Sequence, residues 1–189
     1  SPEREISLIG AAAVRDALVR RGHRVTSYDL SDGFESLLDL AASHDAAFLN
    51  LHGAPGEDGL VQALLDRAGC PYQGSGPAGS FLALHKSAAK SLFRRAGLST
   101  PDWIFLPERP APGWEPRLPY PLFVKSDTGG SSLHLYRVRN GEELQCAMDR
   151  LFASGQTVLI EPLIRGREAT CGVLERGGRA EALPPVLIV

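Results

Sequence analysis

LFVKSDTGGSSLHLYRV, residues 122–138, is the stretch of sequence that decides the fold. The apolar run Leu122–Lys125 ends in a lysine, a loop of small residues follows, and the apolar pattern resumes at Leu133–Val138. Short apolar runs bounded by glycine and serine are typical of strands. The stretch therefore predicts two strands joined by a glycine- and serine-rich loop.

On either side of this hairpin the chain alternates between helical and extended patterns. A helix is expected over Phe81–Ala96, with an interruption around Leu84–Lys86. After the hairpin we expect a helix over Gly141–Ala153, a strand over Thr157–Glu161 and a final strand over Ala180–Val189. The order strand–loop–strand–helix–strand predicts a mainly antiparallel α+β region.

The first third of the chain shows a different pattern. Apolar residues recur at helical spacing over Ile6–Arg21, Phe34–Ala42 and Leu60–Ala68. Two extended segments, His23–Leu30 and Ala46–Leu51, lie between these helices, and the second is a continuous apolar run of the kind found in strands buried on both faces. Strands that alternate with helices predict a parallel α/β layer, so the fold class is α/β. A layer of this type normally opens with a strand, which leads us to expect that the chain is cut at its start and, by its final strand, at its end.

Composition places the chain among ordinary globular proteins. It has 189 residues, 43% hydrophobic and 22% charged, and a formal net charge of −2. With no basic excess and no apolar run long enough to cross a bilayer, we expect neither nucleic acid nor membrane as a partner. Three widely spaced cysteines, Cys70, Cys146 and Cys171, predict buried reduced thiols in a cytosolic protein.

The loop after Lys125 is the first candidate site. Glycines let the backbone approach a ligand, and consecutive N–H groups with hydroxyls suit phosphate oxygens, although such loops are more often plain turns. Lys86 is a second cation that would matter if it converged with Lys125 on one triphosphate, but spacing alone leaves a solvated surface lysine equally open.

Three further positions carry polar groups at the ends of expected strands. Glu161 and Glu168 could accept hydrogen bonds from a base or a sugar, or could be surface acids that flank a turn. His52 opens a glycine-rich loop beyond a buried strand, where ligands collect in open α/β sheets. It has no His or Cys partner at metal-ligand spacing, so a zinc site is rejected. Glu57 and Asp58 in that loop could equally cap the next helix.

The order of short motifs is more specific than any one of them. They are Glu-Arg-Glu-x-Ser at 3–7, His-Gly-x-x-Gly-Glu-Asp-Gly-x-x-Gln at 52–62, Pro-Tyr-x-Gly-Ser-Gly at 71–76, Lys86, Gly-Leu-x-Thr-Pro at 97–101, Val-Lys at 124–125, Gly-Ser-Ser at 130–132 and Gly-Arg-Glu-x-Thr at 166–170. This series resembles the D-alanine–D-alanine ligases of the ATP-grasp superfamily, and the resemblance covers essentially all 189 residues.

The resemblance implies three parts and a reaction. Residues 1–84 would form a parallel, Rossmann-like pre-ATP-grasp lobe, 85–173 the central ATP-grasp lobe, and 174–189 the start of a C-terminal lobe that is largely absent. ATP would phosphorylate the carboxylate of one D-alanine, and the amine of a second D-alanine would attack the acyl phosphate, in the cytoplasmic synthesis of peptidoglycan precursors. Dimerisation through the N-terminal lobe is common in the family.

The resemblance also assigns roles to residues. Glu3 and Ser131 would form the network that holds the ammonium group of the first D-alanine, and His52 would lie near its carboxylate. Lys86 and Lys125 would bind the ATP phosphates. The remaining nucleotide contacts would come from Ser132 in the covering loop, Glu161 at the adenine amino group, the backbones of Pro162 and Ile164 at the base edge, and Glu168 at the ribose.

Departures from the family pattern leave alternatives open. His85 stands where the family usually has Asp, Ser126 where it has Pro, and His134 where it has Gly. No metal ligand is expected in this chain, because the Mg²⁺ ligands belong to the lobe after Val189, and we therefore expect little ligase turnover from these residues alone. The alternatives are a ligase for D-lactate, D-serine or another amine, and a non-catalytic ligase-like nucleotide-binding protein.

Overall fold

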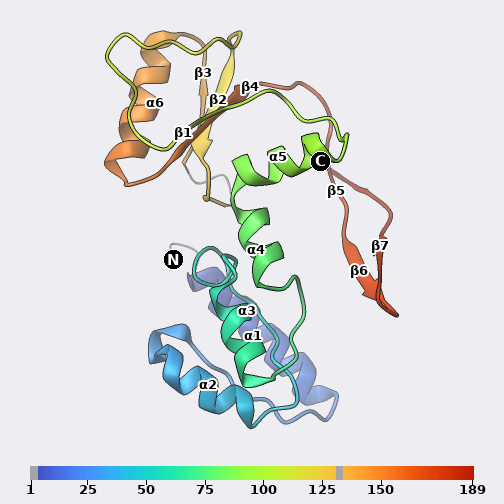
Figure 1. Ribbon diagram of the computed structural model, residues 1–189. Coiled ribbons are helices and arrows are strands. Elements are labelled where there is room, and N and C mark those ends of the chain that lie inside the picture. The colour runs from blue at the N-terminus through green and yellow to red at the C-terminus, as the bar shows by residue number, and fades with distance from the viewer. Residues whose placement is uncertain (1–3, 131–133) are drawn as a thin grey trace.

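The computed structural model describes residues 4–130 and 134–189, which form two bodies joined by a pair of consecutive helices. The joining helices are α4 (Pro77–Leu84) and α5 (Lys86–Arg95), and they meet at His85, whose extended backbone interrupts the helix. The interruption was predicted, whereas the start of the helix lies four residues before the predicted Phe81. Figure 1 shows α4 rising from the N-terminal body and α5 lying beside the central sheet.

The central body is built on a four-stranded antiparallel sheet. Its strands are β1 (Ile104–Leu106), β2 (Leu122–Ser126), β3 (Leu135–Val138) and β4 (Val158–Pro162), in the order β1-β4-β2-β3. All three pairings are antiparallel, so the predicted antiparallel region is confirmed. Strand β1 was not predicted, because three residues are too few to show a period.

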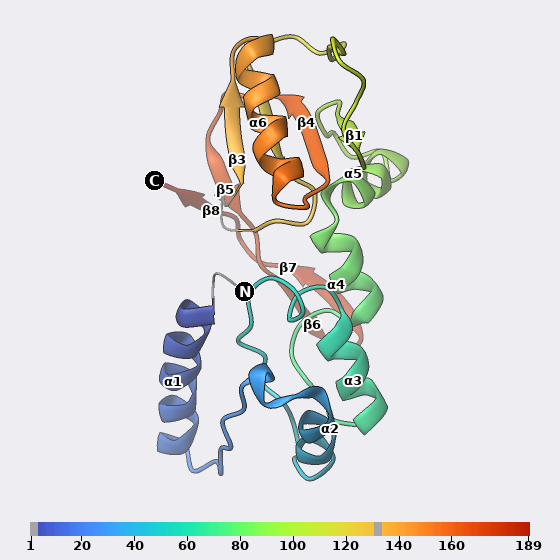
Figure 2. The same cartoon turned by 90° about the vertical axis from the view of Figure 1, so that its left-hand side faces the viewer.

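Helix α6 (Gly141–Ala153) covers one face of this sheet (Figure 2). Its N-cap Asn140 accepts a hydrogen bond from the backbone N–H of Glu143 at 2.9 Å, which satisfies one of the free donors of the first turn. The helix and the sheet share one apolar core, whose buried members are Leu122, Val124, Val138, Leu144, Ala147, Met148, Leu151, Val158 and Ile160. Side chains alternate along a strand. The neighbouring positions of β2, Phe123 and Lys125, therefore face away from α6 and toward α5.

The N-terminal body contains α1 (Arg4–Arg20), the short 3₁₀ helix η1 (Leu30–Asp32), α2 (Phe34–Ala42) and α3 (Leu60–Ala68). The three α-helices confirm the predicted segments to within two residues. Helices α2 and α3 share a small core, whose buried members are Leu37, Ala41, Val61, Leu65 and Cys70.

The two strands predicted in this body are wrong as strands. Segment 23–30 is not in a sheet, and 46–51 makes a single parallel bridge, Ala47 with Tyr72. The reason is the lack of pairing partners among the described residues. The side-chain amide of Gln73 instead accepts a hydrogen bond from the N–H of Leu49 at 2.9 Å and donates one to its carbonyl at 2.6 Å. A cavity of about 1230 Å³ lies between α1 and these extended segments.

The last residues form two small two-stranded sheets, whereas a single strand was predicted over 180–189. Strand β5 (Glu168–Thr170) pairs with β8 (Val186–Ile188), and β6 (Val173–Arg176) pairs with β7 (Arg179–Ala182). The predicted strand 180–189 is therefore wrong in its extent. Two consecutive prolines at 184 and 185, which have no N–H to donate, separate β7 from β8.

No helix in the described part of the chain has the length and apolar character needed to cross a bilayer. The three thiols are free, but only Cys70 is buried, whereas Cys146 and Cys171 are exposed. The prediction of three buried thiols is therefore wrong. Cys146 lies on the outer side of the amphipathic helix α6, and Cys171 precedes an exposed hairpin.

Candidate functional site

A buried aspartate fixes the start of α5 to the loop after β2. Asp127 is 2% exposed, and its carboxylate accepts hydrogen bonds from the backbone N–H of Ser87 at 2.7 Å and from its hydroxyl at 3.1 Å. The N-cap residue itself, His85, makes no side-chain cap; its ring contacts the carbonyl of Phe81 at 2.8 Å. Asp127 thus does the work that an N-cap acid would do, at the positive end of the helix. Sequence patterns could not predict this role, because residues 87 and 127 are forty positions apart.

Lys86 turns its amino group into the same loop. The amino group donates hydrogen bonds to the carbonyls of Asp127, at 3.2 Å, and Gly129. Burial lowers the pKa of Lys86, and the positive charge of Lys125 lowers it further, while Asp127 and Glu161 oppose the shift. Since like charges interact this way only at close range, the structure brings Lys86 and Lys125 to one site.

Lys125 contacts Glu161 across the sheet. Register places Phe123 opposite Glu161 and Lys125 opposite Leu159, so Lys125 and Glu161 are diagonal neighbours on one face, within reach of long side chains. The Lys125 amino group hydrogen-bonds and ion-pairs with Oε1 of Glu161. The two side chains are 22% and 13% exposed.

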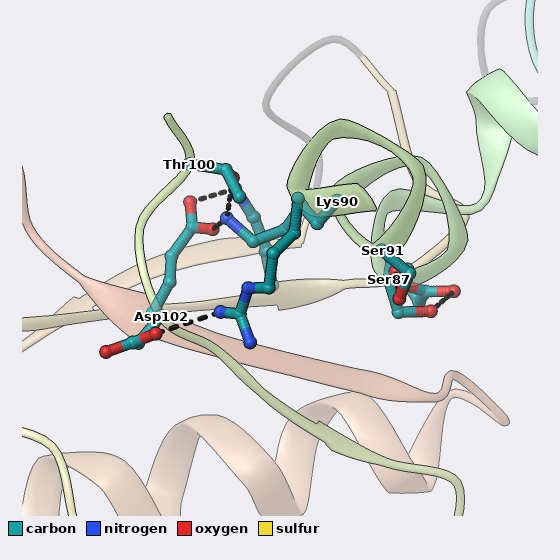
Figure 3. A network of polar contacts seen from close by, with 9 residues as sticks. Ser87, Lys90, Ser91, Thr100 and Asp102 are labelled. Carbon is teal, nitrogen blue, oxygen red and sulfur yellow. Dashed lines mark hydrogen bonds and ion pairs between the residues drawn. The ribbon is translucent and has the colours of Figure 1, made fainter. Parts of the chain in front are cut away.

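Lys90, which the sequence analysis missed, completes the cluster from α5. Its amino group lies 3.0 Å from Oε2 of Glu161, donates to the hydroxyl of Thr100 at 2.9 Å, and lies 5.3 Å from the centre of the Trp103 ring. Figure 3 shows Lys90 pointing from α5 toward Thr100, beside the ion pair that Asp102 makes. A lysine one helical turn after Lys86 was the available signal, because residues four apart share a helix face.

The charge of Glu161 is set by these two lysines. Burial raises the pKa of its carboxyl, but hydrogen bonds from Lys125 and Lys90, and their charges, outweigh burial and hold the pKa below its ordinary value. Glu161 is therefore an anion at neutral pH, with each carboxylate oxygen facing its own lysine.

The chain contains three lysines, and all three are in this cluster; every other side-chain cation outside histidine is an arginine. An ammonium group is a compact point charge on a flexible stem, suited to an oxygen cluster whose geometry changes, whereas arginine offers a rigid planar fork. Three ammonium groups in one place are suited to bind phosphate oxygens as point charges.

The loop that begins at His52 is held together by its own motif residues. Glu57 accepts a hydrogen bond from the N–H of Gly53 at 2.7 Å, and its carboxylate lies 4.0 Å from Nδ1 of His52. Asp58 accepts a hydrogen bond from the N–H of Leu60, the first residue of α3, at 3.0 Å, which is the capping role expected of it. Glu57, of which the same role was expected, bonds within the loop instead. Buried Gln62 donates to the carbonyl of Gly56 at 2.8 Å.

Two glycines in this loop are required by geometry. A Cβ on Gly56 would collide with the side chain of Leu51, and Gly59 has a left-handed φ of 94° and abuts the carbonyl of Pro77. The loop therefore holds its shape through its own motif residues.

The remaining predicted residues lie apart from the lysine cluster or outside the described residues. Pro162 ends β4 directly after Glu161, Ile164 is exposed in the connector that follows, and Glu168 opens β5 and is exposed. Glu3, Ser131 and Ser132 lie outside the described residues. His134, just after them, has a φ of 57°, the left-handed conformation that a glycine adopts without strain.

No group of three or more His, Cys, Asp or Glu side chains within 4–130 and 134–189 is placed to hold a metal ion.

A family model described as "D-ala D-ala ligase C-terminus" matches residues 92–189, which is just over half of the chain. The sequence is 61% identical to a D-alanine–D-alanine ligase of Desulfovibrio desulfuricans and 58% identical to one of Nitratidesulfovibrio vulgaris. Both alignments cover all of this chain, but only 60% and 61% of those proteins. The chain thus spans about three-fifths of the length of these curated relatives.

Solved structures show the same relation. The D-alanine–D-alanine ligase of Bacillus anthracis complexed with ATP aligns with a TM-score of 0.85 at 31% identity, over 100% of this chain and 62% of that one. The ligase of Coxiella burnetii aligns with a TM-score of 0.69 at 33% identity, over 77% of this chain and 44% of that one.

Proposed function

Because this chain belongs to the D-alanine–D-alanine ligase family, we propose that it is the ATP-binding portion of a ligase that joins two D-alanines. In the proposed reaction the carboxylate of one D-alanine attacks the γ-phosphorus of ATP, which gives an acyl phosphate and ADP. The amine of the second D-alanine then attacks the acyl carbon, and phosphate leaves with the bonding electrons. Phosphate is a far better leaving group than hydroxide, which is why the reaction is split in two.

The observation that carries the proposal is the cluster of three lysines around Glu161 between α5 and the open face of the sheet. Lys86 and Lys125 would exchange their present oxygen partners for phosphate oxygens of ATP, since both already direct their amino groups at oxygen acceptors. Glu161 would then accept a hydrogen bond from the adenine amino group. The backbones of Pro162 and Ile164 would contact the base edge, Glu168 the ribose, and Ser132 the phosphates.

The amino-acid pocket rests on the family resemblance and on the fixed loop at His52. His52 would lie near the carboxylate of the first D-alanine, and Glu3 with Ser131 would hold its ammonium group. Positioning and charge stabilisation are the main work of such an enzyme, because the phosphoryl donor carries the driving force. Magnesium, when bound to the whole protein, would neutralise charge on the transferring phosphoryl group.

The proposal also includes a division of the chain into lobes and a cellular compartment. Residues 1–84 are proposed as a parallel, Rossmann-like lobe, 85–173 as the central lobe and 174–189 as the start of a further lobe. The parallel bridge at Ala47 and the full-length alignment with the ATP-complexed ligase support the first of these. Reduced thiols and a use for ATP favour the cytoplasm, with peptidoglycan precursors as the product.

A homodimer through the N-terminal lobe is the proposed assembly. Ile6 and Ile9 of α1 are 62% and 67% exposed, so this helix presents apolar surface that a second copy could cover. Sedimentation velocity tests the assembly. A dimer that Ile9→Glu dissociates supports it, and a monomer at micromolar concentration contradicts it.

Calorimetric titration with ATP tests the nucleotide site. We expect this chain to bind ATP, and Lys125→Ala to weaken binding at least about tenfold, since a charge-assisted hydrogen bond to phosphate is lost. Arg150→Ala is the matched control, because Arg150 lies on α6 at the opposite face of the sheet. Absence of binding by the unaltered chain, or equal weakening by both variants, would contradict the proposal.

A further inference from the structure

Glu161 is shared by two lysines that differ in how firmly they are held. Lys90 has a second donor contact, to Thr100 at 2.9 Å, and lies over the Trp103 ring, and its side chain is 10% exposed. Within the described residues Lys125 hydrogen-bonds to Glu161 alone and is twice as exposed. Lys90 is therefore anchored on three sides, whereas Lys125 is free to exchange its one acceptor for another.

The difference matters because Lys125 is also proposed to bind the phosphates of ATP. If Lys125 moves to the ATP phosphates, the carboxylate of Glu161 loses the partner on Oε1 and keeps the partner on Oε2. A carboxylate that is 13% exposed cannot stay charged without a counter-ion, since burial of an isolated charge is costly. Lys90 is the one cation near Glu161 in the described residues that such an exchange would leave in place.

We propose that Lys90 is a positioning residue that selects an amino-purine nucleotide, by holding Glu161 charged with Oε1 directed at the base after Lys125 has transferred to phosphate. The inference rests on the proposed nucleotide function and adds a residue to it. An anionic carboxylate accepts a hydrogen bond from the 6-amino group of adenine and repels the 6-carbonyl oxygen of hypoxanthine. A neutral Glu161 could donate to that carbonyl instead, and the two bases would be less well distinguished.

The neighbouring arginine gives a matched control. Arg94 is one turn further along α5, lies 4.3 Å from the centre of the same Trp103 ring, and pairs at 2.9 Å with exposed Asp102 instead of Glu161. Its replacement removes a cation from the same helix and the same aromatic ring without touching the carboxylate. Figure 3 shows the ion pair of Asp102 beside the contact between Lys90 and Thr100.

The test compares the affinities of this 189-residue chain for ATP and for inosine triphosphate by calorimetry. We expect Lys90→Met to lower the ratio of the two affinities by about tenfold, as for loss of one hydrogen bond to a charged group. Lys90→Arg should restore most of the ratio, and Arg94→Met should leave it unchanged. In a Glu161→Gln background, Lys90→Met should have no further effect on the ratio, because the carboxylate through which Lys90 acts is gone.

The outcomes separate this inference from the proposed function. An unaltered chain that binds ATP and prefers it over inosine triphosphate, with a ratio unmoved by Lys90→Met, overturns the role of Lys90 and leaves the nucleotide site standing. An unaltered chain that binds neither nucleotide overturns both. Circular dichroism establishes that each variant is folded. If Lys90→Met is unfolded, Lys90→Gln, which keeps a donor but not the charge, takes its place with the same expected loss.

Discussion

The central and N-terminal bodies differ in whether their extended segments pair with neighbouring strands. In the central body every predicted strand pairs with a neighbour, and α6 closes one face over a continuous core. In the N-terminal body segment 46–51 makes one bridge, Ala47 with Tyr72, and segment 23–30 is in no sheet. A cavity of about 1230 Å³ separates both segments from α1. The same kind of sequence pattern thus gives a sheet in one body and isolated segments in the other. A strand needs a neighbouring strand for its backbone hydrogen bonds, whereas a helix makes these bonds within its own segment.

The difference also explains where the candidate site lies. The four-stranded sheet holds Lys125 and Glu161 in fixed register. Helix α5 brings Lys86 and Lys90 against the face of the sheet that α6 does not cover. Such a constellation needs a rigid base, which the central body supplies. The N-terminal body contributes the His52 loop, which its own hydrogen bonds and close-fitting glycines hold in shape.

The largest expected effect contrasts the two cores. Leu151→Ala, at a fully buried position of α6, should lower the free energy of unfolding by about 2–5 kcal/mol, because it leaves a cavity in a closed core. Leu49→Ala, beside the existing cavity, should cost about 1 kcal/mol or less, since its side chain is only half-buried. Urea unfolding followed by circular dichroism measures both. Equal losses would contradict the contrast between a closed and an open body.

The next largest effect is expected at the hydrogen bonds that join Asp127 to the start of α5 in the central body. Asp127→Ala should cost about 1–3 kcal/mol, because the N–H of Ser87 at the start of α5 loses a buried charged acceptor. Asp127→Asn, which keeps an acceptor oxygen, should recover a large part of the loss. Thermal unfolding compares the three proteins, and an Asp127→Ala variant as stable as the unaltered chain would show that the loop does not hold α5.

A smaller effect is expected at the corresponding contact in the N-terminal body. Gln73→Ala removes both hydrogen bonds to the backbone of Leu49 and should cost about 1 kcal/mol, because these groups are accessible to water. Hydrogen exchange at the Leu49 amide should speed up while exchange in β2 and β4 stays unchanged. Faster exchange in both bodies would mean that they unfold as one unit.

The smallest expected effect is a pH dependence confined to the central body. The pKa of Glu161 is held below its ordinary value, so its ion pairs stabilise the fold above that value and the contribution is lost as the pH falls through the lowered pKa. The free energy of unfolding should therefore decline less steeply in acid for Glu161→Gln than for the unaltered chain. Denaturant titrations between pH 7 and about pH 3 measure the slopes. Parallel slopes would contradict the lowered pKa.

The sequence predicted the features that depend on residues close together in the chain. Helical spacing located α2, α3 and α6 to the residue, and glycine and serine marked the loop after β2. The resemblance assigned Lys86, Lys125 and Glu161 to one nucleotide site, and the structure brings these three side chains together. Their roles in nucleotide binding stay a prediction.

What the sequence did not predict depends on partners distant in the chain. The contact between Lys90 and Glu161 joins residues 71 positions apart, and neither helix nor strand periodicity contains that information. The strands expected at 23–30 and 46–51 were wrong for the same reason. Their apolar content fits a buried strand, but pairing is decided by segments elsewhere.

Hydrogen exchange with and without ATP tests most directly the claim that nucleotide binds between α5 and the open face of the central sheet. The account predicts slower exchange at the start of α5, in the loop after β2 and at the exit of β4. Amides that line the N-terminal cavity should be unaffected. Protection confined to the segments around that cavity, or no protection at saturating ATP, would contradict it.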